Sequence, residues 1–225
     1  MTALQIKNIP WGAGDDIKMD ASYTKGDTKN VIATDASSPS FAMFGGSSRL
    51  FVGNAGGLLP AFGSVGFGTT TDAVYLPFAN GGTGDLKLTT AYGFRGAYNH
   101  NWDPYWSSSL FGSWSAVRYG GSEFDITTAK GQFCATVRAG LNAQGAARSV
   151  DFSCNPNYDV AQLGFVTRWT PVKNLTFSAE VMLFHLNQNF NGAALLTPSA
   201  PKPTAVYEFK DQNTVALNVR VQRNF

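Results

Sequence analysis

The sequence predicts an all-β fold, an antiparallel transmembrane β-barrel of which about seven strands lie in this chain. Charged residues make up only 14% of it, aromatic residues make up 13%, and 24 residues are glycine, a composition that favours strands over helices. Apolar and polar residues alternate in several windows, as in strands with one apolar and one polar face. Short turns alternate with long polar loops, the pattern typical of transmembrane barrels.

The predicted strands can be followed along the chain by this two-residue period. In the window 16–25, apolar Ile17 and Met19 alternate with Lys18 and Asp20. Further alternating windows end at turn residues such as those in 101–104 and 171–174, which separate the strands into hairpins. Seven strands are expected, at residues 3–9, 16–25, 86–101, 105–119, 158–170, 175–187 and 212–225.

The closing strand has the clearest pattern. Val215, Leu217, Val219, Val221 and Phe225 share one face, while polar residues and Ala216 occupy the other. A strand with one apolar face that ends on an aromatic residue is typical of the last strand of a membrane barrel.

Three segments, 26–85, 120–157 and 189–211, are long and rich in Gly, Ser, Asn and Pro. In a compact soluble domain, three such loops would count against the strand assignment. Because they alternate with short turns, we assign the long loops to the extracellular side of a barrel and the short turns to the periplasmic side. The whole chain, 1–225, is then one partial barrel domain.

Composition excludes several other classes of protein. The net charge of +2 gives no basic field for nucleic acid. No stretch approaches the roughly 18 apolar residues of a membrane-spanning helix. The first residues, MTALQIKNIP, have no apolar core of signal-peptide length, so either the chain is cytosolic or its export signal lies outside this sequence.

Two cysteines, Cys134 and Cys154, lie 20 residues apart in a polar stretch. One pair in an otherwise thiol-free chain suits a disulfide across an exposed loop in an oxidising compartment. Two unrelated free thiols are the alternative.

Aromatic residues gather near the predicted strand ends. Such girdles are expected where amphipathic rings meet the two membrane interfaces, although Trp is also common near turns in any β protein. We predict interfacial positions for Trp11, Trp102, Trp106, Trp169 and Phe225 at the short turns, and for Tyr23 and Tyr119 near the long loops.

Several motifs resemble the porin family of alphaproteobacterial outer membranes. They are HNWDPYWSSSLFGSWSAVRY at 100–119, NYDVAQLGFVTRWTPVKNLTFSAEVMLFHLNQ at 157–188, RVQRNF at 220–225, TTDAVY at 70–75 and LTTAYGF at 88–94. The resemblance implies a sixteen-stranded barrel, usually a homotrimer, that lets small hydrophilic solutes diffuse passively across the outer membrane. Family members are about twice this length, so the chain is similar to their C-terminal half.

That resemblance carries further expectations. Outer-membrane lipid surrounds such a barrel, and barrel-assembly machinery recognises the C-terminal strand with its terminal Phe. The in-folding loop that narrows such pores is expected in the half that is not present here. Seven strands alone would leave two unpaired edges, which lipid does not tolerate.

A passive pore needs no catalytic residue, cofactor or metal, so its selectivity depends on the charges of its inner wall. Cations outnumber carboxylates six to two in the predicted set, which would favour anions; the alternative is that these side chains only solvate the wall. The predicted pore-lining residues are Lys18, Asp20, Lys87, Arg95, Arg118, Arg168, Glu180 and Arg220, where Arg118 requires a bulge near Val117.

Rival functions have weaker support. An esterase-type barrel could use His185 on the outer wall, but no G-x-S-x-G motif occurs. Two separated histidines and one cysteine pair match no metal-ligand spacing. A soluble or surface-exposed β-sheet adhesin that binds sugars, and a truncated product without pore function, remain open alternatives.

Overall fold

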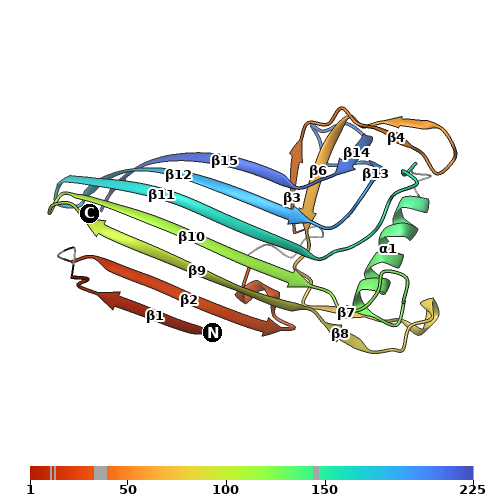
Figure 1. The fold of residues 1–225 in the computed structure, drawn as a ribbon, viewed down its shortest axis with the longest axis horizontal. Coiled ribbons are helices and arrows are strands. Elements are labelled where there is room, and N and C mark those ends of the chain that lie inside the picture. Colours follow the sequence, from red (N-terminus) through yellow and green to blue (C-terminus); the bar gives the residue numbers. More distant parts are fainter. Residues whose placement is uncertain (11, 13, 33–39, 144–146, 225) are drawn as a thin grey trace.

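The computed structural model describes residues 1–10, 12, 14–32, 40–143 and 147–224. Seven strands form one wide antiparallel sheet, and most of the other elements gather beyond one end of it (Figure 1). All seven predicted strands are present, and neighbours in the sheet follow one another in sequence. They are β1 (Thr2–Lys7), β2 (Asp16–Lys25), β9 (Thr90–Asn101), β10 (Trp106–Arg118), β11 (Tyr158–Val172), β12 (Leu175–Gln188) and β15 (Gln212–Arg223).

The large sheet is open. Among the described residues, β1 pairs only with β2 and β15 pairs only with β12. Every pair of neighbouring strands in this sheet is antiparallel. The two edge strands are separated by an even number of antiparallel steps, so β1 and β15 run in the same direction.

The long loops contain regular structure that the sequence analysis did not predict. Four strands, β3 (Phe41–Gly45), β6 (Gly63–Gly68), β13 (Ala193–Leu196) and β14 (Ala205–Phe209), form a second sheet in the order β13-β14-β6-β3. Two small hairpins join β4 (Leu50–Val52) to β5 (Leu58–Pro60) and β7 (Ala73–Tyr75) to β8 (Leu86–Leu88). Helix α1 (Ala129–Ala143) and two short 3₁₀ turns (Thr28–Asn30 and Phe78–Asn80) complete the fold.

These elements correct two expectations. The segment 129–143 was expected to be an irregular loop in an all-β chain and is instead a helix. The segments with β14 and β6 were also expected to be irregular loops and contain a parallel strand pair, whereas the predicted barrel strands pair antiparallel as expected. We call the described residues of 26–89, 119–157 and 189–211 the loop layer. Its segments come from three separate loops, and the pairing of β14 with β6 joins two of these loops.

Helix α1 forms where apolar residues recur every four positions. Phe133, Val137 and Leu141 lie on one face of the helix and pack against the core of the loop layer. Arg138 donates to the carboxylate of Glu123 at 2.8 Å, which ties the opposite side of the helix to the preceding segment.

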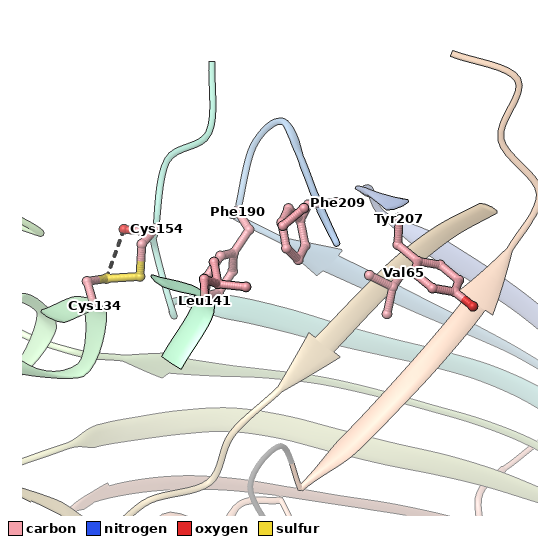
Figure 2. Packing of buried hydrophobic residues seen from close by; sticks show 8 residues of the cluster. Val65, Cys134, Leu141, Cys154, Phe190, Tyr207 and Phe209 are labelled. Atoms are coloured by element: carbon pink, nitrogen blue, oxygen red, sulfur yellow. Dashed lines mark hydrogen bonds between the residues drawn. A yellow bond between two sulfur atoms is a disulfide. The ribbon is translucent and has the colours of Figure 1, made fainter. Parts of the chain in front are cut away.

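The loop layer has a hydrophobic core of its own (Figure 2). Phe190 lies between Phe67 and Phe209, with ring centroids 4.7 and 5.5 Å away. The fully buried Cys134 and Cys154 belong to the same cluster. Burial of this kind contributes about 25 cal/mol per Å² of apolar surface, so the layer is stabilised by its own packing.

Candidate functional site

The register of the large sheet places its apolar side chains on one continuous face. On β15, Val219 and Leu217 lie opposite Ala179 and Val181 of β12, and Val181 lies opposite Phe165 of β11. Most large side chains of this face are exposed, up to 74% for Val219. An apolar face of several strands is far larger than the patches that soluble monomers leave uncovered.

The opposite face is polar. Six of the eight predicted pore-lining residues share it, as the strand pairings show. They are Lys18, Asp20, Arg95, Arg168, Glu180 and Arg220.

Two of the predicted residues lie elsewhere. Lys87 is in β8, which pairs with β7 and not with the large sheet, and its Nζ lies 3.1 Å from Asp85. The alternation through Leu86 and Leu88 therefore belongs to a separate hairpin in the loop layer.

Arg118 shares the apolar face, because β10 keeps its register through Val117 without the bulge that the prediction required. Its guanidinium pairs with Asp159 at 2.5 Å and lies over the ring of Tyr92. Arg118 is therefore not on the polar face.

Charges on the polar face form local pairs at its centre. Arg95 Nε donates to both carboxylate oxygens of Asp20, at 2.9 and 2.7 Å. Lys18 lies 3.2 Å from Asp16. On β12, Glu180 accepts a hydrogen bond from Asn218 at 3.1 Å.

Two arginines create a positive region nearer the short-turn end. Arg168 and Arg220 both lie opposite Ser178, on either side of it. Arg168 donates to Ser109 Oγ at 2.7 Å. Neither arginine forms an ion pair within the described part of the chain.

The corrected set of charges is less one-sided than predicted. The polar face of the described strands carries five cations and three carboxylates, an excess of two positive charges. The cations are Lys7, Lys18, Arg95, Arg168 and Arg220, and the carboxylates are Asp16, Asp20 and Glu180. The sequence analysis missed Lys7 and Asp16, although both continue the polar alternation of their windows.

Part of the segment between β2 and β9 packs on this polar face at its loop-layer end. Val31, Ile32 and Phe41 pack against a cluster that includes Tyr158 and Val160 of β11. This segment therefore covers part of the polar face near the loop layer.

Glycine permits that close approach. A Cβ on Gly66 of β6 would lie 2.9 Å from the carbonyl oxygen of Lys210 and 3.0 Å from Leu186 Cδ2. A Cβ on Gly68 would lie 2.8 Å from Tyr158 Cζ. Larger residues at either position would push the second sheet away from the wall.

The predicted interfacial aromatic residues divide into three groups. Tyr23, Trp102, Trp106 and Trp169 are exposed, and the rings of Trp106 and Trp169 lie 6.3 Å apart near the short turns. Trp11 and Phe225 lie outside the described residues.

Tyr119 does not fit the prediction. It is buried against Phe133 of α1 and donates to the carbonyl of Thr69 at 2.8 Å. Burial raises the pKa of Tyr119 to about 12. Its position next to a polar loop gave no signal that a helix would cover it.

Cys134 and Cys154 form a disulfide with an S–S distance of 1.99 Å and a Cα–Cα distance of 5.6 Å. Figure 2 shows the bond joining α1 to the chain that leads into β11. Both residues are fully buried, so the bond lies in a core and not across an exposed loop.

A second cluster fixes the short-turn end of the sheet. The buried carboxylate of Asp15 accepts hydrogen bonds from the Tyr98 hydroxyl at 2.7 Å and from the Asn101 backbone N–H at 2.9 Å. His100 Nδ1 lies 2.6 Å from the same carboxylate. The hydrogen bond with His100, followed by that from Asn101, lowers the pKa of Asp15 to about 2.

Chemistry of other kinds finds little support in the described residues. His185 pairs with Asn213 at 2.7 Å, and no serine contacts it there. No group of three potential metal-ligating side chains occurs in the part of the chain that the structure covers. No helix within the described ranges has the length and apolar character needed to cross a membrane.

The large sheet is broad and antiparallel, with one exposed apolar face and one charged face. Amphipathic sheets of this kind form the walls of β-barrel proteins. The family model of the porin subfamily matches residues 3–218. The chain therefore belongs to the porin family, whose members are in general non-enzymatic channels of the outer membrane. No curated protein and no solved structure matches it.

Proposed function

We propose that this chain forms part of the wall of an outer-membrane channel through which ions and small hydrophilic solutes diffuse passively. The observation that carries the proposal is the separation of faces: six predicted pore-lining charges share one face, and the opposite face is a continuous apolar surface. Lipid contacts the apolar face in this arrangement, while water and solutes contact the polar face.

Strand direction supports completion by further strands. Because β1 and β15 run in the same direction, a barrel closed by pairing β1 with β15 would contain one parallel strand pair. If an odd number of further strands lies between them, every pair of neighbouring strands can be antiparallel. The sixteen strands implied by the resemblance would require nine more, which is an odd number.

We further propose a weak preference for anions. Arg95 and Lys18 are neutralised by neighbouring carboxylates, whereas Arg168 and Arg220 are not paired with any within the described residues. Fixed positive charge on a pore wall lowers the barrier for anions.

Channel recordings in planar bilayers under a KCl gradient test both the proposed channel function and the proposed anion preference. A complete barrel that contains this wall should open ion-conducting channels with a reversal potential on the chloride side of zero. The double variant Arg168→Glu/Arg220→Glu should move the reversal potential toward potassium. Lys173→Glu, in the turn between β11 and β12, is the matched control and should leave it unchanged. An absence of channels would overturn the proposed function; channels selective for potassium would overturn only the anion preference.

The same proposal places the apolar face against outer-membrane lipid or a neighbouring subunit of a homotrimer. Barrel-assembly machinery would recognise the strand 212–225. Support for both comes from the exposed apolar row of β15 and from the family assignment. Cross-linking of the protein in native outer membranes would yield trimers if the trimer proposal is correct, and only monomers if it is wrong.

A further inference from the structure

The loop layer contains a cleft of about 810 Å³ between α1 and the second sheet. It lies away from the polar face of the large sheet, beyond its loop-layer end, where Figure 1 shows α1 and the strands β3 and β6. Its main walls are Phe133, Val137 and Gly140 on α1, Phe44, Val65 and Phe67 on the sheet, and the segment 196–199 with Lys202.

The cleft is an opening in the core of the loop layer. Phe67, Phe133, Val137 and Leu196 pack against the buried cluster but remain partly exposed, and all four line the cleft. Small-molecule sites are concave, mostly apolar and about 300–1,000 Å³ in volume. The cleft has the size and the lining of such a site.

One charge distinguishes the cleft. Lys202 is the only charged side chain among the described residues that line it. Its Nζ lies 4.6 Å from the centroid of the Phe44 ring, and it forms no ion pair within the described chain.

The one acidic residue in the strands of the second sheet has another partner. Glu208 on β14 is buried and pairs with Arg49 at 3.0 Å. The exposed ammonium of Lys202 thus offers a positive charge next to an apolar surface.

We propose that this cleft binds a small organic anion, an aromatic or alkyl carboxylate. Its apolar part packs against Phe67, Phe133 and Leu196, and its carboxylate faces Lys202. Thr197 and Ser199 also line the cleft. The site is separate from the polar wall, so the proposal does not depend on conduction.

Calorimetric titration tests the charge. The full chain in phosphatidylcholine nanodiscs is titrated with 1-naphthaleneacetate and with the neutral 1-naphthaleneacetamide, and heats from empty nanodiscs are subtracted. The acid should bind about three- to fivefold more tightly than the amide, the effect of one exposed ion pair. Lys202→Ala should remove that difference, and Lys173→Ala, in a turn at the opposite end of the sheet, should preserve it.

Filling the cleft tests the apolar part. A Cβ on Gly140 meets no atom within 4 Å, so Gly140→Phe should place a ring in open space and also favour the helix. It should weaken both probes about tenfold while circular dichroism stays unchanged. Equal binding of acid and amide to wild type, binding unaffected by Gly140→Phe, or no binding above empty nanodiscs would each overturn the proposal.

Discussion

The large sheet and the loop layer differ in where they bury apolar side chains. On β15, Leu217 and Val219 are 69% and 74% exposed, whereas in the loop layer Val65 and Phe190 are each 2% exposed. The loop layer buries part of its apolar surface in a core of its own, although side chains such as Phe78 and Phe124 are exposed. The sheet leaves a whole face uncovered, and the proposed function assigns this face to lipid.

The largest expected effect comes from a charge on the apolar face. Leu217→Arg should destabilise insertion by about 2–4 kcal/mol, the cost of a cation facing the centre of a bilayer. Equilibrium folding into phosphatidylcholine vesicles over a denaturant series measures it.

The adjacent residue provides the control. Asn218→Arg places the same side chain on the polar face beside Glu180 and should be nearly neutral. If both variants insert equally well, the two faces do not meet different solvents and the comparison fails.

Removing the disulfide should affect the loop layer alone. Cys134→Ser/Cys154→Ser should destabilise it by about 3 kcal/mol in the chain-entropy model for a loop of this size. Limited proteolysis should then cut within 119–157, while the sheet remains associated with vesicles. Release of the sheet from vesicles would show that the two regions are not independently stabilised.

A smaller effect is expected where the two regions meet. Gly66→Ala brings a methyl group to 2.9 Å from the carbonyl oxygen of Lys210 and should cost about 1–3 kcal/mol through overpacking. Gly46→Ala is the control, because its Cβ meets no atom within 4 Å. Thermal unfolding, monitored by circular dichroism, compares the melting temperatures of the two variants. Identical melting temperatures would show that the contact between position 66 and Lys210 is not tight.

The smallest effect concerns pH at the short-turn end. The pKa of Asp15 is lowered to about 2, below its unfolded value. The ionised carboxylate therefore contributes stability above the unfolded pKa, near 4, and this contribution is lost as the pH falls through about 2. Acid unfolding of wild type and Asp15→Asn should differ above pH 4 and converge near pH 2; parallel curves at all pH values would contradict this.

The strands of the wall were predictable because a half-buried strand carries its two faces in a local two-residue period. The same rule assigned Arg95, Arg168 and Arg220 to the polar face. It failed for Lys87, since alternation does not show which partner a strand pairs with. It failed for Arg118 because a bulge was assumed where the register is unbroken.

The loop layer was not predictable in the same way. The parallel pairing of Tyr207 with Gly63 joins residues from different loops, which no local pattern records. Helix α1 did leave a signal, since Phe133, Val137 and Leu141 recur every four residues, but the surrounding Gly and polar residues concealed it. The cleft and Lys202 depend on these non-local contacts.

The parallel pair of β6 and β14 has a mechanical consequence. β6 belongs to the loop between β2 and β9, and β14 to the loop between β12 and β15. Their hydrogen bonds therefore connect points on either side of the four central strands, as a chord connects two points of an arc. The four strands fix the length of the arc, so a pairing that also fixes the chord helps to set how strongly the wall curves, and with it the width of any channel that this wall encloses.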